Sequence, residues 1–141
     1  MSPKKREQPA INLTDLGNSR IVAQKHGDDL RHVYGLGWHR FKGTHWELDR
    51  TGEVVRCAAQ SIPGHWCRLA AEVVAEAVDA DSETRNAASK RAEEYLRWAR
   101  TSESASRIFA ALKLAEAEAS LVATVDDLDG GTAEETVTFS L

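Results

Sequence analysis

Residues 35–49 (GLGWHRFKGTHWELD) constrain the fold more than any other part of the sequence. They contain two of the four tryptophans, two of the five histidines and three of the nine glycines. Two short runs, 38–41 and 45–48, flank Lys42-Gly43-Thr44. A glycine between two such runs is typical of a β-hairpin, because glycine takes the positive φ that a tight loop needs. We therefore expect a hairpin here.

The register of this hairpin depends on the length of its loop. A three-residue loop places Arg40 opposite Trp46 and Trp38 opposite Leu48. Side chains alternate between the faces of a strand, so Trp38, Trp46 and Leu48 then share one face. The other face carries His39, Phe41, His45 and Glu47. A two-residue loop would separate the tryptophans, so we prefer three residues. An isolated hairpin is marginal in water, and its tryptophan face needs helices to cover it.

Composition predicts one helix-rich domain. The chain has 141 residues, a net charge of −4 and an apolar fraction of 42% with only 6% aromatic residues. No run of about 18 apolar residues predicts a transmembrane helix, and no apolar segment near the N-terminus predicts a signal peptide. Cys57 and Cys67 are too few for a disulfide framework. We expect a cytoplasmic protein with free thiols and no membrane partner.

The start of the chain predicts a tail, a helix and a strand. Residues 1–12 hold KKR and two prolines and are interpreted as a disordered basic tail. Thr14 is a suitable N-cap for a helix from Asp15 to about His26, which ends at Gly27 as a C′ glycine. Residues 30–34 read as an extended run into the hairpin, and a third strand there is an open alternative.

The remainder of the chain is predicted to be helical. After a turn at residues 50–52, a helix is expected over 53–60, and residues 61–64 with Pro63 interrupt it. From His65 an amphipathic stripe follows. Its members are Trp66, Leu69, Ala70, Val73, Val74, Ala77 and Val78.

Two further helices are expected, over about 83–100 with Ser82 as cap and over about 103–124 with Thr101 or Ser102 as cap. The inner side of the second is predicted to hold Ile108, Leu112, Ala115, Ala119 and Val122. Residues 13–125 are thus expected to form one α+β domain: a leading helix, a small antiparallel hairpin-centred sheet, then three or more packed helices. Residues 126–141 are interpreted as an acidic, irregular segment.

No catalytic motif occurs in the sequence. It has neither the phosphate-binding pattern G-x-x-x-x-G-K-[ST] nor a G-x-S-x-G elbow, so we expect no enzyme activity and no cofactor. Cys57, His65 and Cys67 are residue types that bind zinc, but their spacing fits no standard site. We expect no metal, buried inert cysteines, and histidines at the surface or in loops.

Two groups of residues are candidates for weak nucleic-acid binding. Arg40, Lys42 and Trp46 in the hairpin combine cations with an aromatic face, on which guanidinium or a base can stack. The alternative is that Trp38 and Trp46 are the apolar core of the sheet. The second group is Arg85, Lys90, Arg91 and Arg97 in the helix over 83–100. Glutamates are interleaved with these cations, so the alternative is a mixed solvated face.

Several ordered segments carry a resemblance to a known family. They are Thr14-Asp15-Leu16-Gly17-Asn18, His26-Gly27-Asp28-Asp29-Leu30-Arg31, Gly37-Trp38 with Gly43-Thr44-His45-Trp46, Thr51-Gly52-Glu53-Val54, and Ser102-Glu103-Ser104 with Arg107-Ile108. In this order they resemble the N-terminal-like helicase-associated domain of phage and plasmid replication primases, which poxvirus primase-helicases carry in related form. The resemblance covers about residues 14–129.

The resemblance implies a non-catalytic domain between a primase module and a superfamily 3 helicase. Such a domain helps to assemble the hexameric helicase and couples it to DNA. We therefore expect a phage or prophage replication domain in a bacterial host. Its expected partners are a helicase or primase module, or a second copy, together with single-stranded or forked DNA.

The sequence departs from the family pattern where the helicase is expected, soon after Asp129. Two alternatives stay open: an excised domain, or a short gene product that interferes with a replication partner. A small DNA-binding regulator, with the helices from Ser82 onward as a helix-turn-helix-like pair, is another hypothesis. A metal-dependent enzyme that uses Cys57, His65 and Cys67 is a third.

Overall fold

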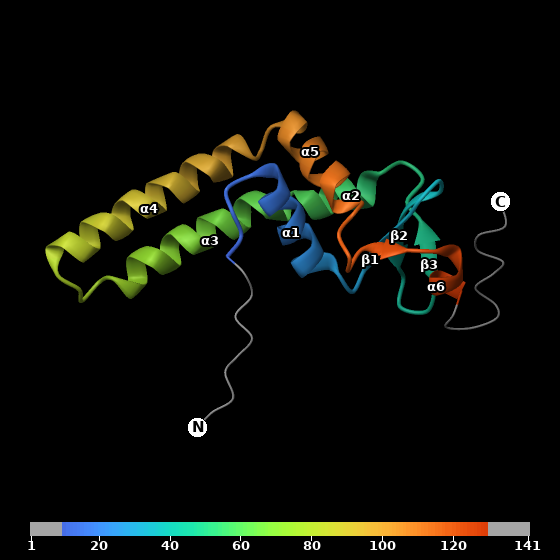
Figure 1. Ribbon diagram of the computed structural model, residues 1–141, viewed down its shortest axis with the longest axis horizontal. Helices are drawn as coiled ribbons and strands as arrows, with labels where there is room; N and C mark the ends of the chain where they lie inside the picture. Colours follow the sequence, from blue (N-terminus) through green and yellow to red (C-terminus); the bar gives the residue numbers. More distant parts are fainter. Residues whose placement is uncertain (1–9, 130–141) are drawn as a thin grey trace, which may run out of the picture.

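The computed structural model describes residues 10–129, and these form an α+β fold as predicted (Figure 1). The elements in order are α1 (Asp15–His26), β1 (Leu30–Val33), β2 (Gly37–Phe41), β3 (Trp46–Leu48), α2 (Glu53–Ala59), α3 (Ser61–Glu76), α4 (Ser82–Thr101), α5 (Ala105–Ala115), β4 (Val122–Ala123) and α6 (Val125–Asp129). In Figure 1 the long pair α3 and α4 extends to one side, and the sheet with α6 lies on the other. None of the described helices combines the length and the apolar character needed to cross a lipid bilayer.

The sheet is mixed, whereas the sequence predicted an antiparallel one. Its strand order is β3-β2-β1-β4, with β1–β2 and β2–β3 antiparallel and β1–β4 parallel. The third strand that the sequence left open, β1, is therefore present. The parallel strand β4 was not predicted. Its approach is fixed by the backbone amide of His32, which donates to the carbonyl of Leu121 at 2.6 Å.

The predicted hairpin register is wrong by one residue. Phe41 pairs with Trp46 and Arg40 with Glu47, so the loop has four residues, 42–45. The amide of Lys42 closes it by donating to the carbonyl of His45 at 2.8 Å, and Gly43 supplies a φ of 90°. This register places Trp38 and Trp46 on opposite faces.

The physical reason for the shift is that apolar residues cover both faces of this sheet. Trp38 belongs to the main core together with Leu30. Trp46 packs on the other face, against a smaller cluster of Val33, Ala123 and Leu128. A three-residue loop would put both indoles on one face, whereas each face of this sheet is covered by one of them.

The local signals for α1 are confirmed. Thr14 Oγ1 accepts a hydrogen bond from the amide of Gly17 at 2.9 Å, and the helix has the predicted bounds. Gly27 caps its end with a φ of −61°, so the left-handed conformation of a C′ glycine is not used. Ile11, inside the segment predicted to be a tail, packs against the main core.

The start of α3 and the caps of the later helices differ from the predicted ones. Residues 61–64, predicted to interrupt the helix, form the first turn of α3, because proline is tolerated where the helix amides have no partner within the helix, and the break lies at Gln60. Asp81, not Ser82, caps α4, because its carboxylate accepts from the amide of Thr84 at 2.7 Å. Hydrogen bonds from the backbone amide and the side chain of Thr84 hold the pKa of Asp81 below its usual value. Ser104, not Thr101 or Ser102, caps α5 by accepting from the amide of Arg107 at 3.3 Å.

The end of the described chain also differs from the prediction. The helix expected over 103–124 ends at Ala115, and the chain turns into β4. Ala119 and Val122, predicted to lie inside, are exposed, whereas Leu121 and Ala123 on either side of Val122 are buried. The segment expected to be irregular begins within α6, whose Leu128 is buried. The final TVTFSL lies outside the described residues.

Candidate functional site

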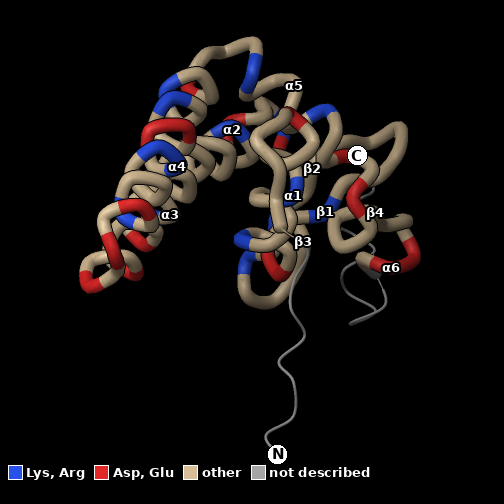
Figure 2. The backbone as a smooth tube through the Cα atoms, turned by 60° about the vertical axis from the view of Figure 1, so that its left-hand side comes forward, with Lys and Arg blue, Asp and Glu red and all other residues tan. Residues whose placement is uncertain are grey.

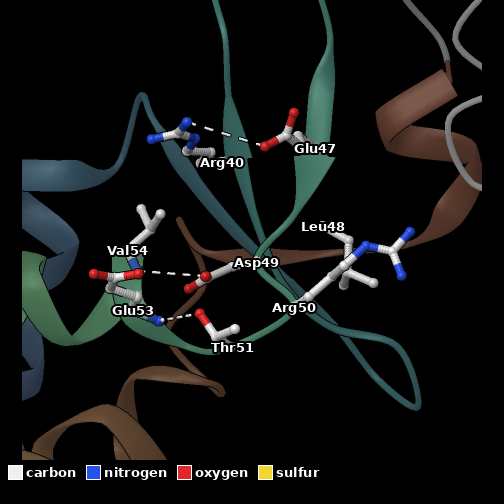
Figure 3. Close-up of a pocket in the computed structure, with 8 residues that line it drawn as sticks. All are labelled: Arg40, Glu47, Leu48, Asp49, Arg50, Thr51, Glu53 and Val54. Atoms are coloured by element: carbon white, nitrogen blue, oxygen red, sulfur yellow. Dashed lines mark hydrogen bonds and ion pairs between the residues drawn. The ribbon is translucent and has the colours of Figure 1, made fainter.

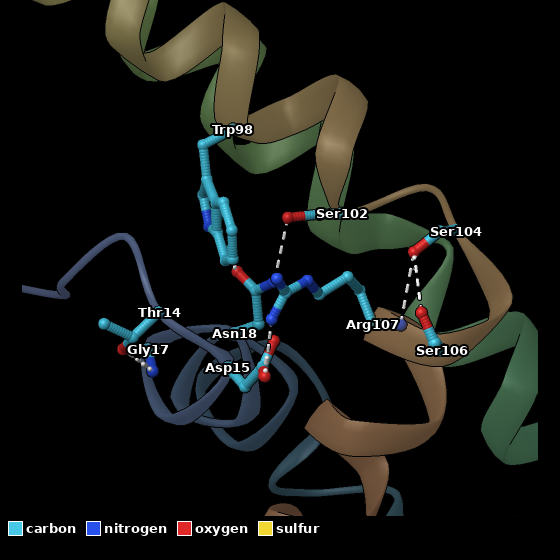
Figure 4. A network of polar contacts seen from close by, with 9 residues as sticks. All are labelled: Thr14, Asp15, Gly17, Asn18, Trp98, Ser102, Ser104, Ser106 and Arg107. Atoms are coloured by element: carbon cyan, nitrogen blue, oxygen red, sulfur yellow. Dashed lines mark hydrogen bonds and ion pairs between the residues drawn. The ribbon is translucent and has the colours of Figure 1, made fainter.

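A polar network centred on Asn18 connects α1 with α3 and α4, and Figure 4 draws Asn18 with Trp98 and Ser102. Asn18 Oδ1 accepts hydrogen bonds from the indole nitrogens of Trp66 at 2.8 Å and of Trp98 at 3.1 Å. Its Nδ2 donates to Ser102 Oγ at 2.9 Å. Asn18, Trp66 and Ser102 are all buried. A buried amide with these bonds fixes α1 relative to α3 and α4, since each bond is costly to leave unmade.

An ion pair continues this network to α5. Arg107 Nη1 lies 3.0 Å from Asp15 Oδ2, and the guanidinium lies over the indole of Trp98, with Cζ 5.5 Å from its centroid. Residues 14–18 and 102–107, two of the segments that carry the family resemblance, therefore meet in one place (Figure 4). Their polar groups are engaged in holding helices together.

The structure brings the hairpin candidates Arg40 and Lys42 together, but both of these cations pair with the carboxylate of Glu47. Arg40 Nη2 lies 4.0 Å and Lys42 Nζ 3.4 Å from the carboxylate of Glu47. The predicted stacking of Arg40 on Trp46 is wrong, because the two lie on opposite faces. Arg31 occupies that place instead, with Cζ 5.1 Å from the centroid of Trp46.

Sequence reasoning missed Arg31 because the pairing of β1 with β2 was not predicted. In that pairing Arg31 is opposite His39, on the face that also carries Phe41 and Trp46. The guanidinium of Arg31 also donates to the backbone carbonyls of Gly27 and Leu30. It is therefore bound to its own chain as well as to the indole.

A depression of about 430 Å³ lies between the hairpin and the start of α2 (Figure 3). It is lined by Arg40, Glu47, Leu48, Asp49, Arg50, Thr51, Glu53 and Val54. The Asp49 carboxylate accepts from the amides of Val54 at 3.3 Å and Val55 at 3.0 Å, so it caps α2. Cations and carboxylates are mixed in the remaining lining, and neither sign of charge dominates.

The four candidates on α4 are exposed and lie apart from the hairpin (Figure 1). Arg91 folds back on its own helix, because its Nε donates to the hydroxyl of Tyr95 at 2.9 Å and its Cζ lies 5.2 Å from that ring. Arg85, Lys90 and Arg97 alternate with acidic residues, and Figure 2 shows both colours along the helix. The seven predicted residues thus form two separate groups.

The predictions that the cysteines are buried and that His39 lies at the surface or in a loop are wrong. Cys57 and Cys67 are exposed rather than buried. Within residues 10–129, no group of three or more His, Cys, Asp or Glu side chains could hold a metal ion. His39, predicted to lie at the surface, is 1% exposed, and its Nδ1 lies 3.1 Å from the carbonyl of Gly37. Burial is the main cause of its lowered pKa.

An apolar stripe on α3 is exposed, although the sequence predicted part of it as core. Cys67, Ala71 and Val74 follow one another on α3 at spacings of four and three residues, Val78 lies in the turn just after α3, and all four are exposed. Val74 retains 46% and Val78 63% of its accessible surface. The buried side of α3 consists of Ile62, Trp66 and Ala70. The apolar surface of α3 is thus wider than the core uses, and the sequence pattern did not separate its two parts.

Comparison with known families identifies the chain. The family model described as D5 N terminal like matches residues 19–132. The chain belongs to this family. The match confirms the resemblance drawn from the sequence motifs, and it begins directly after Asn18. D5 N-terminal-like domains are associated with replication and precede a helicase. Comparison with curated proteins and with solved structures gives no match.

Proposed function

We propose that this D5 N-terminal-like domain is a non-catalytic docking module of a replication system, and that α3 is its contact surface. The observation that carries the proposal is the exposed stripe of Cys67, Ala71, Val74 and Val78. Spacings of four and three residues place Cys67, Ala71 and Val74 along one side of α3, and Val78 follows in the turn after the helix. A partner helix can bury such a stripe by packing along it, as in a coiled coil.

The position of α3 supports this proposal. α3 and α4 extend away from the sheet as a pair (Figure 1). The base of α3 is fixed by the bond from Trp66 to Asn18, so its outer part is presented in one orientation. A rigid surface loses little conformational entropy when it binds. The proposed partner is a primase or helicase module of the same replication system, with a second copy of the chain as the alternative.

The non-catalytic part of the proposal is supported by the use of the polar residues. Asn18, Ser102, Asp15 and Arg107 bond to one another or to tryptophans of the core. Asp49 is engaged as a helix cap. We expect the purified domain alone to hydrolyse no nucleotide and to separate no DNA strands above the buffer rate. Activity that persists through purification and is lost on a point substitution would contradict this part.

Docking through α3 is tested with paired variants. V74E/V78E places two charges on the stripe, and N86E/A87E places two charges on exposed positions of α4. Light scattering after size-exclusion chromatography measures the mass of the domain alone and after mixing with the separate primase and helicase modules. We expect the wild type and N86E/A87E to form a complex and V74E/V78E to remain free. The proposal fails if the wild type forms no complex in any mixture, or if V74E/V78E binds as the wild type does.

A further inference from the structure

Four basic or titratable side chains meet where the end of α1 contacts the start of α3. Lys25 and His26 are the last two residues of α1, and His65 and Arg68 are the fifth and eighth residues of α3. The two helices contact each other, and α1 passes beneath α3 in Figure 1. His26 Nε2 lies 3.4 Å from Ser61 Oγ, the first residue of α3. These four residues form what we call the α1–α3 corner.

Positive charge is crowded at the α1–α3 corner. The pKa of Lys25 is lowered, first by burial and then by the charge of Arg68. The pKa of His65 is also lowered, first by burial and then by Lys25 and Arg68, while Glu72 acts in the opposite direction. Among the described residues, neither Lys25 nor Arg68 takes part in an ion pair.

Helix dipoles explain the cations on α1 but not those on α3. Cations at the end of α1 are favoured, because a helix C-terminus carries partial negative charge. His65 and Arg68 lie beyond the first turn of α3, so the dipole of α3 does not stabilise their charges. This first turn contains no acidic residue and no side-chain cap. The positive charge of the corner therefore comes from its exposed side chains, Lys25 and Arg68.

We propose that the α1–α3 corner binds the phosphate backbone of DNA. Lys25 and Arg68 are exposed, and Gly64 beside them has no atom within 4 Å of the place where a Cβ would stand. An open surface suits a polyanion, which contacts several cations at once and releases counterions. A single small anion gains little from exposed charges. The net charge of −4 does not oppose this, because contact depends on the local patch.

The corner differs from the two groups that the sequence singled out. Arg40 and Lys42 share the carboxylate of Glu47. The cations of α4 alternate with glutamates along a solvated helix. At the corner, Glu72 is the carboxylate that acts on the cluster, and it acts on His65. The inference goes beyond the proposed docking function and does not depend on it.

Fluorescence anisotropy with a labelled single-stranded oligonucleotide and with the matching duplex tests the inference. K25Q/R68Q removes two charges from the corner, and K90Q/R97Q removes two exposed charges from α4. We expect K25Q/R68Q to weaken binding at low salt by about tenfold or more and to reduce the slope of log Kd against log salt by about two. We expect K90Q/R97Q to change the affinity by less than about threefold. Thermal melting confirms that both variants are folded.

Three results would overturn the inference. The first is a wild type that shows no salt-sensitive binding to either oligonucleotide. The second is an equal loss in the two variants, which would indicate a diffuse charge effect. The third is unchanged binding by K25Q/R68Q. Failure of the docking function is read separately, from the masses of the V74E/V78E mixtures.

Discussion

The side-chain oxygen of Asn18 accepts a hydrogen bond from the indole nitrogen of Trp66 at 2.8 Å, and both side chains are fully buried. A residue on the first helix thereby positions the largest side chain of α3. The same oxygen also accepts from Trp98, which belongs to α4. One amide therefore sets the relative positions of three helices.

Replacing Asn18 with alanine is expected to destabilise the fold by about 2–4 kcal/mol, because buried indole and hydroxyl groups lose their partner. Urea denaturation followed by circular dichroism measures the change. Asn86→Ala, on the exposed side of α4, is the control and should change stability by less than about 0.5 kcal/mol. Equal effects of the two substitutions would show that the Asn18 network contributes little.

Two glycines in helices should respond to alanine in opposite directions. At Gly17 a Cβ would lie 1.8 Å from the carbonyl oxygen of Asn12, so Gly17→Ala is expected to cost about 1–3 kcal/mol through forced backbone movement. At Gly64 a Cβ would meet nothing within 4 Å. Gly64→Ala should stabilise the protein by about 0.5–1 kcal/mol, because alanine loses less entropy in a helix. Melting temperatures of the two variants test this pair, and a stabilising Gly17→Ala would contradict the close approach.

Asp49 is expected to stabilise α2 from outside the helix. Asp49→Ala removes the acceptor for the amides of Val54 and Val55 and should cost about 1 kcal/mol. Asp49→Asn keeps an acceptor oxygen and should recover part of this loss. Chemical denaturation compares both with Arg50→Ala, a neighbouring exposed position. If asparagine is no better than alanine, the cap is not the source of the effect.

Stability should fall as the solution becomes acidic. Burial is the main cause of lowered pKa values at His32, His39 and His65. The unfolded chain therefore binds protons more readily than the folded one. This contribution is complete above the unfolded pKa of about 6.5 and is lost as the pH falls through the lowered folded values. Asp81, whose pKa is also lowered, loses its contribution only at more acidic pH.

Denaturation at about pH 7.5 and about pH 5 measures this dependence. His39→Gln should flatten it, because glutamine does not titrate. His45→Gln is the control, since His45 lies in the hairpin loop at partial exposure. Equal stability at the two pH values, or greater stability at the lower one, would contradict the assignment.

The hairpin shows how far local reasoning reaches. Gly43 between two short runs predicted the turn, because a positive φ is a property of the residue itself. The register was wrong because it depends on what covers each face. Trp46 faces Leu128 of α6, a helix that the sequence did not predict, and this contact joins positions far apart in the chain.

The candidate site follows the same division. The motifs containing Asn18 and Arg107 were recognised from the sequence, whereas their meeting at the tryptophans was visible only in the folded chain. The α1–α3 corner joins Lys25 with Arg68, which lie 43 residues apart in the sequence, and no local pattern predicts that they meet. Val74 and Val78 were predicted as core, because the sequence does not show whether another element covers an apolar residue.

By itself, the sequence determined the family, the α+β class and the bounds of α1. These depend on motif order and on hydrogen bonds between residues only a few positions apart. The tertiary structure decided the hairpin register, the parallel strand β4, and which sides of the sheet and of α3 are covered. Those depend on pairing and burial between distant segments, whose free energy no local pattern contains.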